Sequence, residues 1–224
     1  MRYFKPLSYW VLLGLLLVTI AGMAQSPRPG YLPNDFSFLM NKAGDTVAPL
    51  DLGYLNFLGV PEAWKYTTGH RDVIIGLSDG AVDTTLIDFR GKTRILKTAP
   101  IASGHGLSVG AIAVAQGDNN FGIPGVCYDC GLLTTNYGNP NLEMLLELGQ
   151  NGAKVINASW VTSQKTARAQ EVIDELMAMG TVVVAGAGNE NWKKNKGKTL
   201  YYPASLDKVI SVSSVMYLHQ DPKE

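Results

Sequence analysis

Short runs of consecutive apolar residues restrict the fold of this chain more than any other feature. The apolar residues are unbroken rather than alternating, which is typical of strands covered on both faces. These runs lie at residues 73–77, 131–135, 154–159, 181–185 and 209–213. Segments with helical spacing separate them, and alternating strands and helices predict an α/β fold with a mainly parallel sheet.

Three segments between the runs are predicted to be helical. The first begins with Asn139, a capping residue followed by proline at the first helical position, and ends at a glycine by position 152. The second places apolar residues at helical spacing over 166–179 and ends at a glycine. The third, 105–115, is rich in Ala, Val and Gly and is predicted to be buried.

Residues 1–24 have the pattern of a secretory signal peptide. Basic residues precede an apolar run at 10–20, and the small residues Gly22 and Ala24 stand at positions −3 and −1 of a cut after Ala24. An uncleaved membrane anchor is the alternative, but it needs ~20 apolar residues and this run has about a dozen. We expect a secreted or periplasmic protein that leaves the membrane once the signal is removed.

The rest of the chain is expected to form one domain. Residues 25–50 are rich in Pro, Gly, Asn and Asp and are predicted to be an irregular arm before a domain at 51–224. The chain has a formal net charge of zero, with 46% hydrophobic and 17% charged residues. This ordinary globular composition disfavours disorder and a nucleic-acid-binding surface.

The two cysteines, Cys127 and Cys130, stand as Cys-x-x-Cys. An exported chain meets an oxidising compartment, so a local disulfide is expected. Two thiols alone cannot complete a four-ligand zinc site, and metal binding and redox catalysis are the disfavoured alternatives.

Polar residues with catalytic potential stand beside the predicted strands. Asp79 follows the first run, and Asn189 follows the fourth in Gly-Ala-Gly-Asn. Reactive groups of a parallel sheet belong at the carboxyl ends of its strands. His105 opens the predicted buried helix, whose dipole keeps an imidazole neutral, as a general base must be. Each signal alone is weak, but a carboxylate, an imidazole and an amide donor in this order are specific.

The segments that contain Asp79, His105 and Asn189, taken in chain order, resemble those of the subtilisin-like serine peptidases, or subtilases. The resemblance covers about residues 51–217 and rests on four motifs: Ile-Gly-Leu-Ser-Asp-Gly-Ala-Val-Asp at 75–83, His-Gly-Leu-Ser-Val-Gly-Ala at 105–111, Val-Ile-Asn-Ala-Ser-Trp at 155–160 and Ala-Gly-Asn-Glu-Asn at 187–191. It implies the three-layer subtilisin-like fold, a mainly parallel sheet flanked by helices, with its C-terminal part missing.

The resemblance also implies a role for each site residue. Asp79 would orient His105, which would take a proton from a serine nucleophile, while Asn189 would donate to the oxyanion. A peptide or protein substrate would bind in extended form beside the remaining site residues, Ser159, Trp160, Val161, Ala187 and Gly188. Val161 stands where the family usually has glycine at the wall of the primary specificity pocket, so a bulky P1 side chain is expected to be excluded.

The family's nucleophile motif, Gly-Thr-Ser, does not occur in the sequence, which ends at Glu224. We expect the chain to be inactive as written. It is either a fragment of an active peptidase or a truncated, peptide-binding pseudo-enzyme, and the complete Asp, His and Asn set favours the fragment.

An esterase is a further alternative, because residues 106–110 fit Gly-x-Ser-x-Gly, the nucleophile elbow, with Ser108 as nucleophile. Its partners would be His219 and either Asp174 or Asp207. The elbow needs a buried strand before it, and the preceding segment contains a proline instead. A nucleotide-binding module is disfavoured because no phosphate-binding glycine motif occurs.

The segment Asp118-Asn119-Asn120 resembles the calcium-binding loop of some subtilases. Hydrated turns of Asp and Asn are common, so an ordinary turn is the alternative. Calcium is therefore compatible with the sequence, while no cofactor is required for the expected chemistry.

Overall fold

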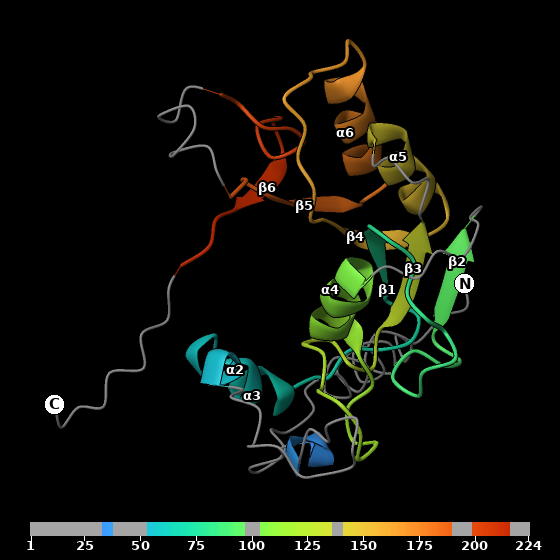
Figure 1. Cartoon of the computed structure of the whole chain (residues 1–224). Helices are drawn as coiled ribbons and strands as arrows, with labels where there is room; N and C mark the ends of the chain where they lie inside the picture. Colours follow the sequence, from blue (N-terminus) through green and yellow to red (C-terminus); the bar gives the residue numbers. More distant parts are fainter. Residues whose placement is uncertain (1–32, 38–52, 97–103, 136–140, 190–198, 216–224) are drawn as a thin grey trace, which may run out of the picture.

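The computed structural model describes residues 33–37, 53–96, 104–135, 141–189 and 199–215. Its centre is a six-stranded sheet in the order β2-β3-β1-β4-β5-β6, in which every neighbouring pair is parallel (Figure 1). The strands are β1 Ile74–Ser78, β2 Thr93–Leu96, β3 Gly131–Thr135, β4 Ala153–Ala158, β5 Val182–Gly186 and β6 Val209–Val212. The predicted α/β class and parallel sheet are confirmed.

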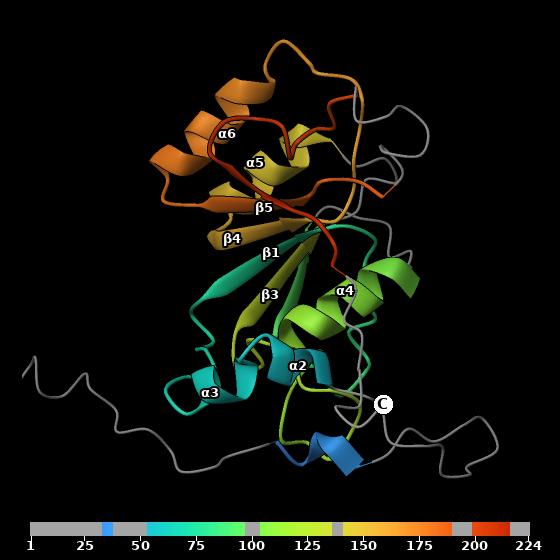
Figure 2. The ribbon, with the colours of Figure 1, turned by 90° about the vertical axis from the view of Figure 1, so that its left-hand side faces the viewer.

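Helices cover both faces of the sheet, so the fold has three layers (Figure 2). On one face lie α5 Leu142–Gln150 and α6 Ala169–Ala178, and α4 Gly104–Val114 covers the other. The alternation of side chains along a strand separates the two cores. Leu133 of β3 packs with α5 and α6, whereas its neighbour Leu132 packs with Leu77 and Val114 on the α4 side.

All the apolar runs predicted to be strands form strands, within two residues of the expected limits. Strand β2 was not predicted. It is four residues long, Thr-Arg-Ile-Leu, and lies at the edge of the sheet, paired with β3 alone. Two of its four residues are polar, so it lacks the apolar run that marks the other strands, including β6 at the opposite edge.

Two predicted helix starts were wrong. Helix α5 begins at Leu142 and its N-cap is Asn141, whose side chain accepts a hydrogen bond from Met144 N at 3.2 Å. The predicted cap, Asn139, lies outside the described residues. Helix α6 begins at Ala169 rather than near residue 166, because the residues before it form a turn, in which Ala169 N donates to Thr166 O at 3.1 Å, and the N-cap Arg168 makes no side-chain cap.

A small separate core joins the N-terminal helices to the disulfide segment. Helices α2 Gly53–Phe57 and α3 Val60–Trp64 contribute Trp64, whose indole Nε1 donates to Val126 O at 2.9 Å. The Trp64 and Tyr128 rings lie with centroids 5.5 Å apart. The structure contains the predicted disulfide between Cys127 and Cys130, which closes the short turn that includes Tyr128.

The predicted signal peptide, residues 1–24, lies outside the described residues. Within the predicted irregular arm, residues Asn34–Ser37 form a short 3-10 helix, η1. Among the helices of the described ranges, none has the length and apolarity to cross a membrane.

Candidate active site

The carboxyl end of β1 positions a buried carboxylate. Asp79 follows the last residue of β1 and is only 9% exposed. Its Oδ1 accepts a hydrogen bond from Gly80 N at 2.6 Å. A carboxylate that is buried and hydrogen-bonded to the backbone has a fixed orientation. It can therefore orient a second side chain that hydrogen-bonds to it.

Helix α4 brings His105 to this carboxylate. His105 lies in the first turn of the helix, and its Nδ1 is 2.9 Å from Asp79 Oδ1 and 2.8 Å from Oδ2. The imidazole side chain is 64% exposed, whereas that of Asp79 is 8% exposed. With Nδ1 held by a carboxylate, Nε2 is the nitrogen that can exchange a proton with a nucleophile.

Gly106 makes this approach of the helix possible. A Cβ atom at Gly106 would lie 1.9 Å from Gly80 O, far closer than any side chain tolerates. The first turn of α4 and the loop after Asp79 are therefore in backbone contact. The sequence contained this signal, a glycine directly after the histidine, but its steric role is evident only in the structure.

Hydrogen bonds connect the segment after β4 to β1 and to the segment that contains Tyr202. Asn157 Nδ2 donates to Ser159 Oγ at 2.9 Å, and the Trp160 indole Nε1 donates to Ser78 Oγ at 2.9 Å. Thr162 forms an antiparallel bridge with Tyr202, with N–H···O distances of 2.9 and 2.8 Å. Asn157, Ser78 and Tyr202 were not predicted as site residues, because their role depends on contacts between distant segments.

A hollow of about 280 Å³ lies beyond the carboxyl ends of β4, β5 and β6. It is lined by residues from these three strand ends, namely Asn157, Ser159, Val184, Ala185, Gly186, Ala187, Gly188, Asn189, Val212, Ser213 and Ser214. Ser159, Ala187, Gly188 and Asn189, four of the predicted site residues, are thereby brought together. Trp160, Val161, Asp79 and His105 do not line this hollow, and Ser213 and Ser214 were not predicted.

Gly188 has a φ of 100°, and the ring of Tyr201 covers its Cα. A Cβ atom at Gly188 would lie 2.8 Å from Tyr201 Cδ2. Because Tyr202 pairs with Thr162, the Tyr201–Tyr202 segment contacts both strand extensions. It therefore joins the two segments that were predicted to bind substrate.

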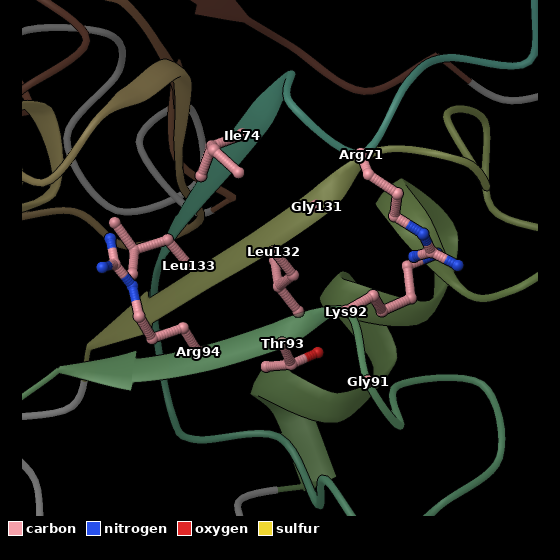
Figure 3. A pocket seen from close by; sticks show the side chains of 9 residues that line it. All are labelled: Arg71, Ile74, Gly91, Lys92, Thr93, Arg94, Gly131, Leu132 and Leu133. Carbon is pink, nitrogen blue, oxygen red and sulfur yellow. The ribbon is translucent and has the colours of Figure 1, made fainter.

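A second hollow, of about 350 Å³, lies near the amino ends of β1 and β3, remote from Asp79 (Figure 3). Figure 3 shows the side chains of Arg71 and Lys92 close together, away from Arg94. Burial lowers the pKa of Lys92 to about 7, and the positive charge of Arg71 adds to this effect. The nine lining residues include cations but no carboxylate, so they cannot form an Asp–His site.

The model of the subtilase family, Peptidase S8, matches residues 70–220. The chain belongs to the subtilase family. Among the curated subtilases, the thermophilic serine proteinase of Bacillus sp. strain AK1 is 29% identical over 170 residues, covering 68% of this chain and 41% of that protein. Subtilisin DY of Bacillus licheniformis is 33% identical over 121 residues, covering 50% of this chain and 43% of that protein. The chain thus spans less than half of either subtilase.

Solved subtilase structures share the fold. Fervidolysin from Fervidobacterium pennivorans, a keratinolytic enzyme related to subtilisin, gives a TM-score of 0.63 at 22% identity, covering 88% of this chain and 32% of that one. The psychrophilic protease Apa1 from Pseudoalteromonas sp. AS-11 gives 0.58 at 20% identity, covering 70% and 38%. At these identities the likeness concerns the fold alone, and the predicted subtilisin-like α/β fold is confirmed.

The nucleophile elbow predicted for the esterase alternative is not formed. Ser108 lies inside α4, one turn after Gly104, and its Oγ donates to Gly104 O at 2.8 Å. A nucleophile elbow requires a sharp turn between a strand and a helix, which exposes the serine. The Gly-x-Ser-x-Gly match therefore belongs to the subtilase helix that carries His105, and His219 lies outside the described residues.

The segment Asp118-Asn119-Asn120, which resembles a calcium-binding loop, presents N–H donors to a carboxylate. The N–H groups of Asp118 and Asn119 donate to the carboxylate of Asp35. Within the described ranges, no group of three or more His, Cys, Asp or Glu residues is placed to hold a metal ion. The inward-facing N–H groups of this loop suit a negatively charged partner, here the Asp35 carboxylate.

Proposed function

We propose that this chain carries the acid–base pair, the oxyanion donor and the substrate-binding segments of an exported endopeptidase with an Asp-His-Ser triad. The contact between His105 Nδ1 and both carboxylate oxygens of Asp79 is the observation that carries the proposal. Such a contact between a buried carboxylate and an accessible imidazole is the acid–base half of a serine peptidase.

In this mechanism Asp79 keeps the proton of His105 on Nδ1. His105 Nε2 takes the proton of a serine hydroxyl as that oxygen attacks the peptide carbonyl, and later gives it to the leaving amine. The Asn189 amide donates to the oxygen that becomes negatively charged. In a subtilisin, removal of one such donor costs about 3 kcal/mol of transition-state stabilisation.

The nucleophile is proposed to come from a segment outside this sequence. No Gly-Thr-Ser occurs in the 224 residues, and the chain spans 41% of the Bacillus AK1 proteinase and 43% of subtilisin DY. Loss of the serine from a triad costs on the order of 10⁶ in turnover. The alternative is a peptide-binding pseudo-enzyme, which has no need for a paired Asp79 and His105.

We propose that an extended peptide binds between the extensions of β4 and β5, by strand addition to Ser159–Val161. Two side chains support a preference for a small P1 residue. Val161 is 41% exposed on the β4 extension. The ring of Tyr201 occupies the space beside Gly188, on the β5 extension. Peptide substrates with Ala at P1 are expected to be cleaved faster than those with Phe.

Export through the signal at residues 1–24 is part of the proposal. The Cys127–Cys130 disulfide is consistent with an oxidising destination, either the periplasm or the outside of the cell. The substrate would then be an extracellular or periplasmic peptide or protein.

The test begins with the source gene. Its reading frame is followed past codon 224, and casein hydrolysis is measured for the 224-residue chain and for the product of the whole frame. We expect a continuing frame that encodes Gly-Thr-Ser, hydrolysis by the longer protein alone, and its loss in His105→Ala. The matched control is His70→Ala, because the His70 side chain is 72% exposed and faces Asp72 rather than Asp79.

A stop codon after Glu224 in a protein that folds would contradict the peptidase and favour the pseudo-enzyme. Hydrolysis that survives in His105→Ala would contradict the assigned acid–base pair. A preference for Phe over Ala at P1, in a longer protein that is active and needs His105, would contradict only the specificity.

A further inference from the structure

The loop at residues 118–121 has a backbone shape that directs its N–H groups inward. Asp118 and Asn120 have φ values of 66° and 59°, and Gly122 has 62°. Left-handed residues alternating with ordinary ones make successive N–H groups converge on one point, which forms an anion-binding concavity.

The concavity is filled by η1, from more than eighty residues earlier in the chain. Asp35 Oδ2 accepts from Asp118 N at 2.5 Å, and Asp35 Oδ1 accepts from Asn119 N at 3.1 Å and from Phe121 N at 3.4 Å. The remaining donor, Asn120 N, binds Asn34 Oδ1 at 2.9 Å. The backbone N–H groups of residues 118–120 therefore have their acceptors on two consecutive residues of η1, whereas Phe121 N has a shorter contact, 2.9 Å, to Asn119 Oδ1 within the loop.

This contact is buried and directional. Asp35 is 5% exposed, although it belongs to a segment that the sequence predicted to be irregular. A charged acceptor makes hydrogen bonds about twice as strong as neutral ones, and their loss leaves N–H groups without acceptors. The contact is therefore strong enough to order η1, which at four residues is too short to be stable on its own.

A neighbouring carboxyl group shows that negative charge is concentrated here. Asp88 Oδ1 accepts from Asn119 Nδ2 at 2.7 Å. Burial raises the pKa of the Asp88 carboxyl, and the nearby negative charge of Asp35 acts in the same direction. Both carboxylates have protein donors within hydrogen-bond distance, and those donors take the place that a cation would have.

We propose that residues 33–37 are a docking segment of the folded protein, anchored by the Asp35 carboxylate in the concavity of residues 118–121, and that this contact holds the loop without calcium. The folded unit therefore begins by residue 33. The proposal does not depend on the proposed peptidase activity.

The test compares Asp35→Asn and Asp35→Ala in the 224-residue chain. The matched control is Asp83→Asn, because Asp83 also accepts a loop N–H, from Thr85 N at 2.8 Å, but the contact is local and exposed. Thermal unfolding is followed in EDTA and in millimolar calcium chloride, and hydrogen exchange is measured at the amides of 118, 119 and 121.

We expect Asp35→Asn to lower the unfolding midpoint by about 5 °C, and Asp35→Ala to lower it further. Exchange at the amides of 118 and 119 should rise by ~10-fold or more, since loss of a charge-assisted hydrogen bond changes exchange by that factor. The 121 amide should change less, because it also donates to Asn119 Oδ1 at 2.9 Å. Asp83→Asn should leave these amides unchanged, and calcium should not alter the midpoint of the unsubstituted chain.

Two results would overturn the proposal. Unchanged exchange at these amides in both Asp35 variants would show that η1 does not dock there. A midpoint that rises with calcium in the unsubstituted chain, but not in Asp35→Asn, would make Asp35 a metal ligand rather than an anchor for N–H groups.

Discussion

His105 Nδ1 faces both carboxylate oxygens of Asp79, at 2.9 and 2.8 Å. One of these oxygens also accepts from Gly80 N, so the carboxylate cannot rotate without breaking a second contact. A carboxylate only accepts hydrogen bonds, which requires the neutral imidazole to carry its proton on Nδ1. The free lone pair is then on Nε2, where a general base needs it.

The first prediction concerns this tautomer. Asp79→Asn replaces an obligate acceptor with an amide that can also donate, so the Nε2–H tautomer of His105 should gain population. Imidazole ¹⁵N shifts of the 224-residue chain report the change directly. In a triad enzyme the same substitution lowers turnover by about 10⁴ because the tautomer is wrong.

The control for the tautomer is Asp72→Asn, which removes the exposed carboxylate near His70, 3.5 Å from its Nδ1. It should leave the ¹⁵N shifts of His105 unchanged. An Nδ1–H signal for His105 that is the same in Asp79→Asn as in the unsubstituted chain would mean that Asp79 does not set the tautomer.

The second prediction separates two glycines of the same helix turn. Gly106→Ala places a Cβ 1.9 Å from Gly80 O, so α4 must move away from the loop that holds Asp79. The free energy of unfolding should fall by about 1–3 kcal/mol, the usual cost of overpacking. Gly104→Ala is the matched control, since its Cβ would have no neighbour within 4 Å.

Chemical denaturation measures both variants. Gly104→Ala should be neutral or slightly stabilising, because alanine favours the helix. Equal losses in the two variants would indicate that helix propensity or backbone freedom, and not the close approach to Gly80, determines stability here.

The sequence predicted the central features because they depend on local pattern. Continuous apolar runs marked every strand that has a neighbour on each side, and Asp79 and His105 were predicted from their motifs. Strand β2 was missed because two of its four residues are polar, whereas β6, at the other edge, has an apolar run. The N-cap was misplaced at Asn139 because Asn141 has the same local chemistry.

Contacts between distant segments could not be predicted from pattern. Asp35 reaches the loop at 118–121 from a Pro- and Gly-rich segment that looks irregular. The Trp160 indole bonds Ser78, but nothing in either neighbourhood signals the partner. The Trp160–Ser78 pair depends on how β1 and β4 lie side by side, which only the fold supplies.

The third prediction uses the buried Lys92, whose Nζ donates to the carbonyls of Val114 and Tyr128. Burial lowers its pKa to about 7 in the folded protein, whereas an unfolded lysine titrates near ~10.4. Between these values the unfolded state binds more protons. The free energy of unfolding should therefore rise with pH, by at most about 1.4 kcal/mol per unit, and fall as pH drops towards 7.

Urea unfolding of the 224-residue chain measures this slope at several pH values from ~7.5 to ~9.5. This range lies between the folded and the unfolded pKa of Lys92. Lys92→Met should remove it. Lys208→Met is the control, because the Lys208 ammonium is about half exposed, 2.8 Å from Asp174, and its loss should leave the slope in place. A slope that persists in Lys92→Met would assign it to another group.

The last prediction concerns the hydrogen bond from Trp160 Nε1 to Ser78 Oγ, which connects the predicted substrate segment to the last residue of β1, directly before Asp79. Ser78 is fully buried, so Trp160→Phe leaves its hydroxyl without this donor and should cost about 1–3 kcal/mol. Ser78→Ala removes the hydroxyl itself, so the indole N–H loses its acceptor. In the double variant neither polar group remains, and the combined loss should be smaller than the sum of the single losses by about 1 kcal/mol. Additive losses in urea unfolding would mean that the two side chains contribute through packing alone, and that the substrate segment is held by its bridge to Tyr202 instead.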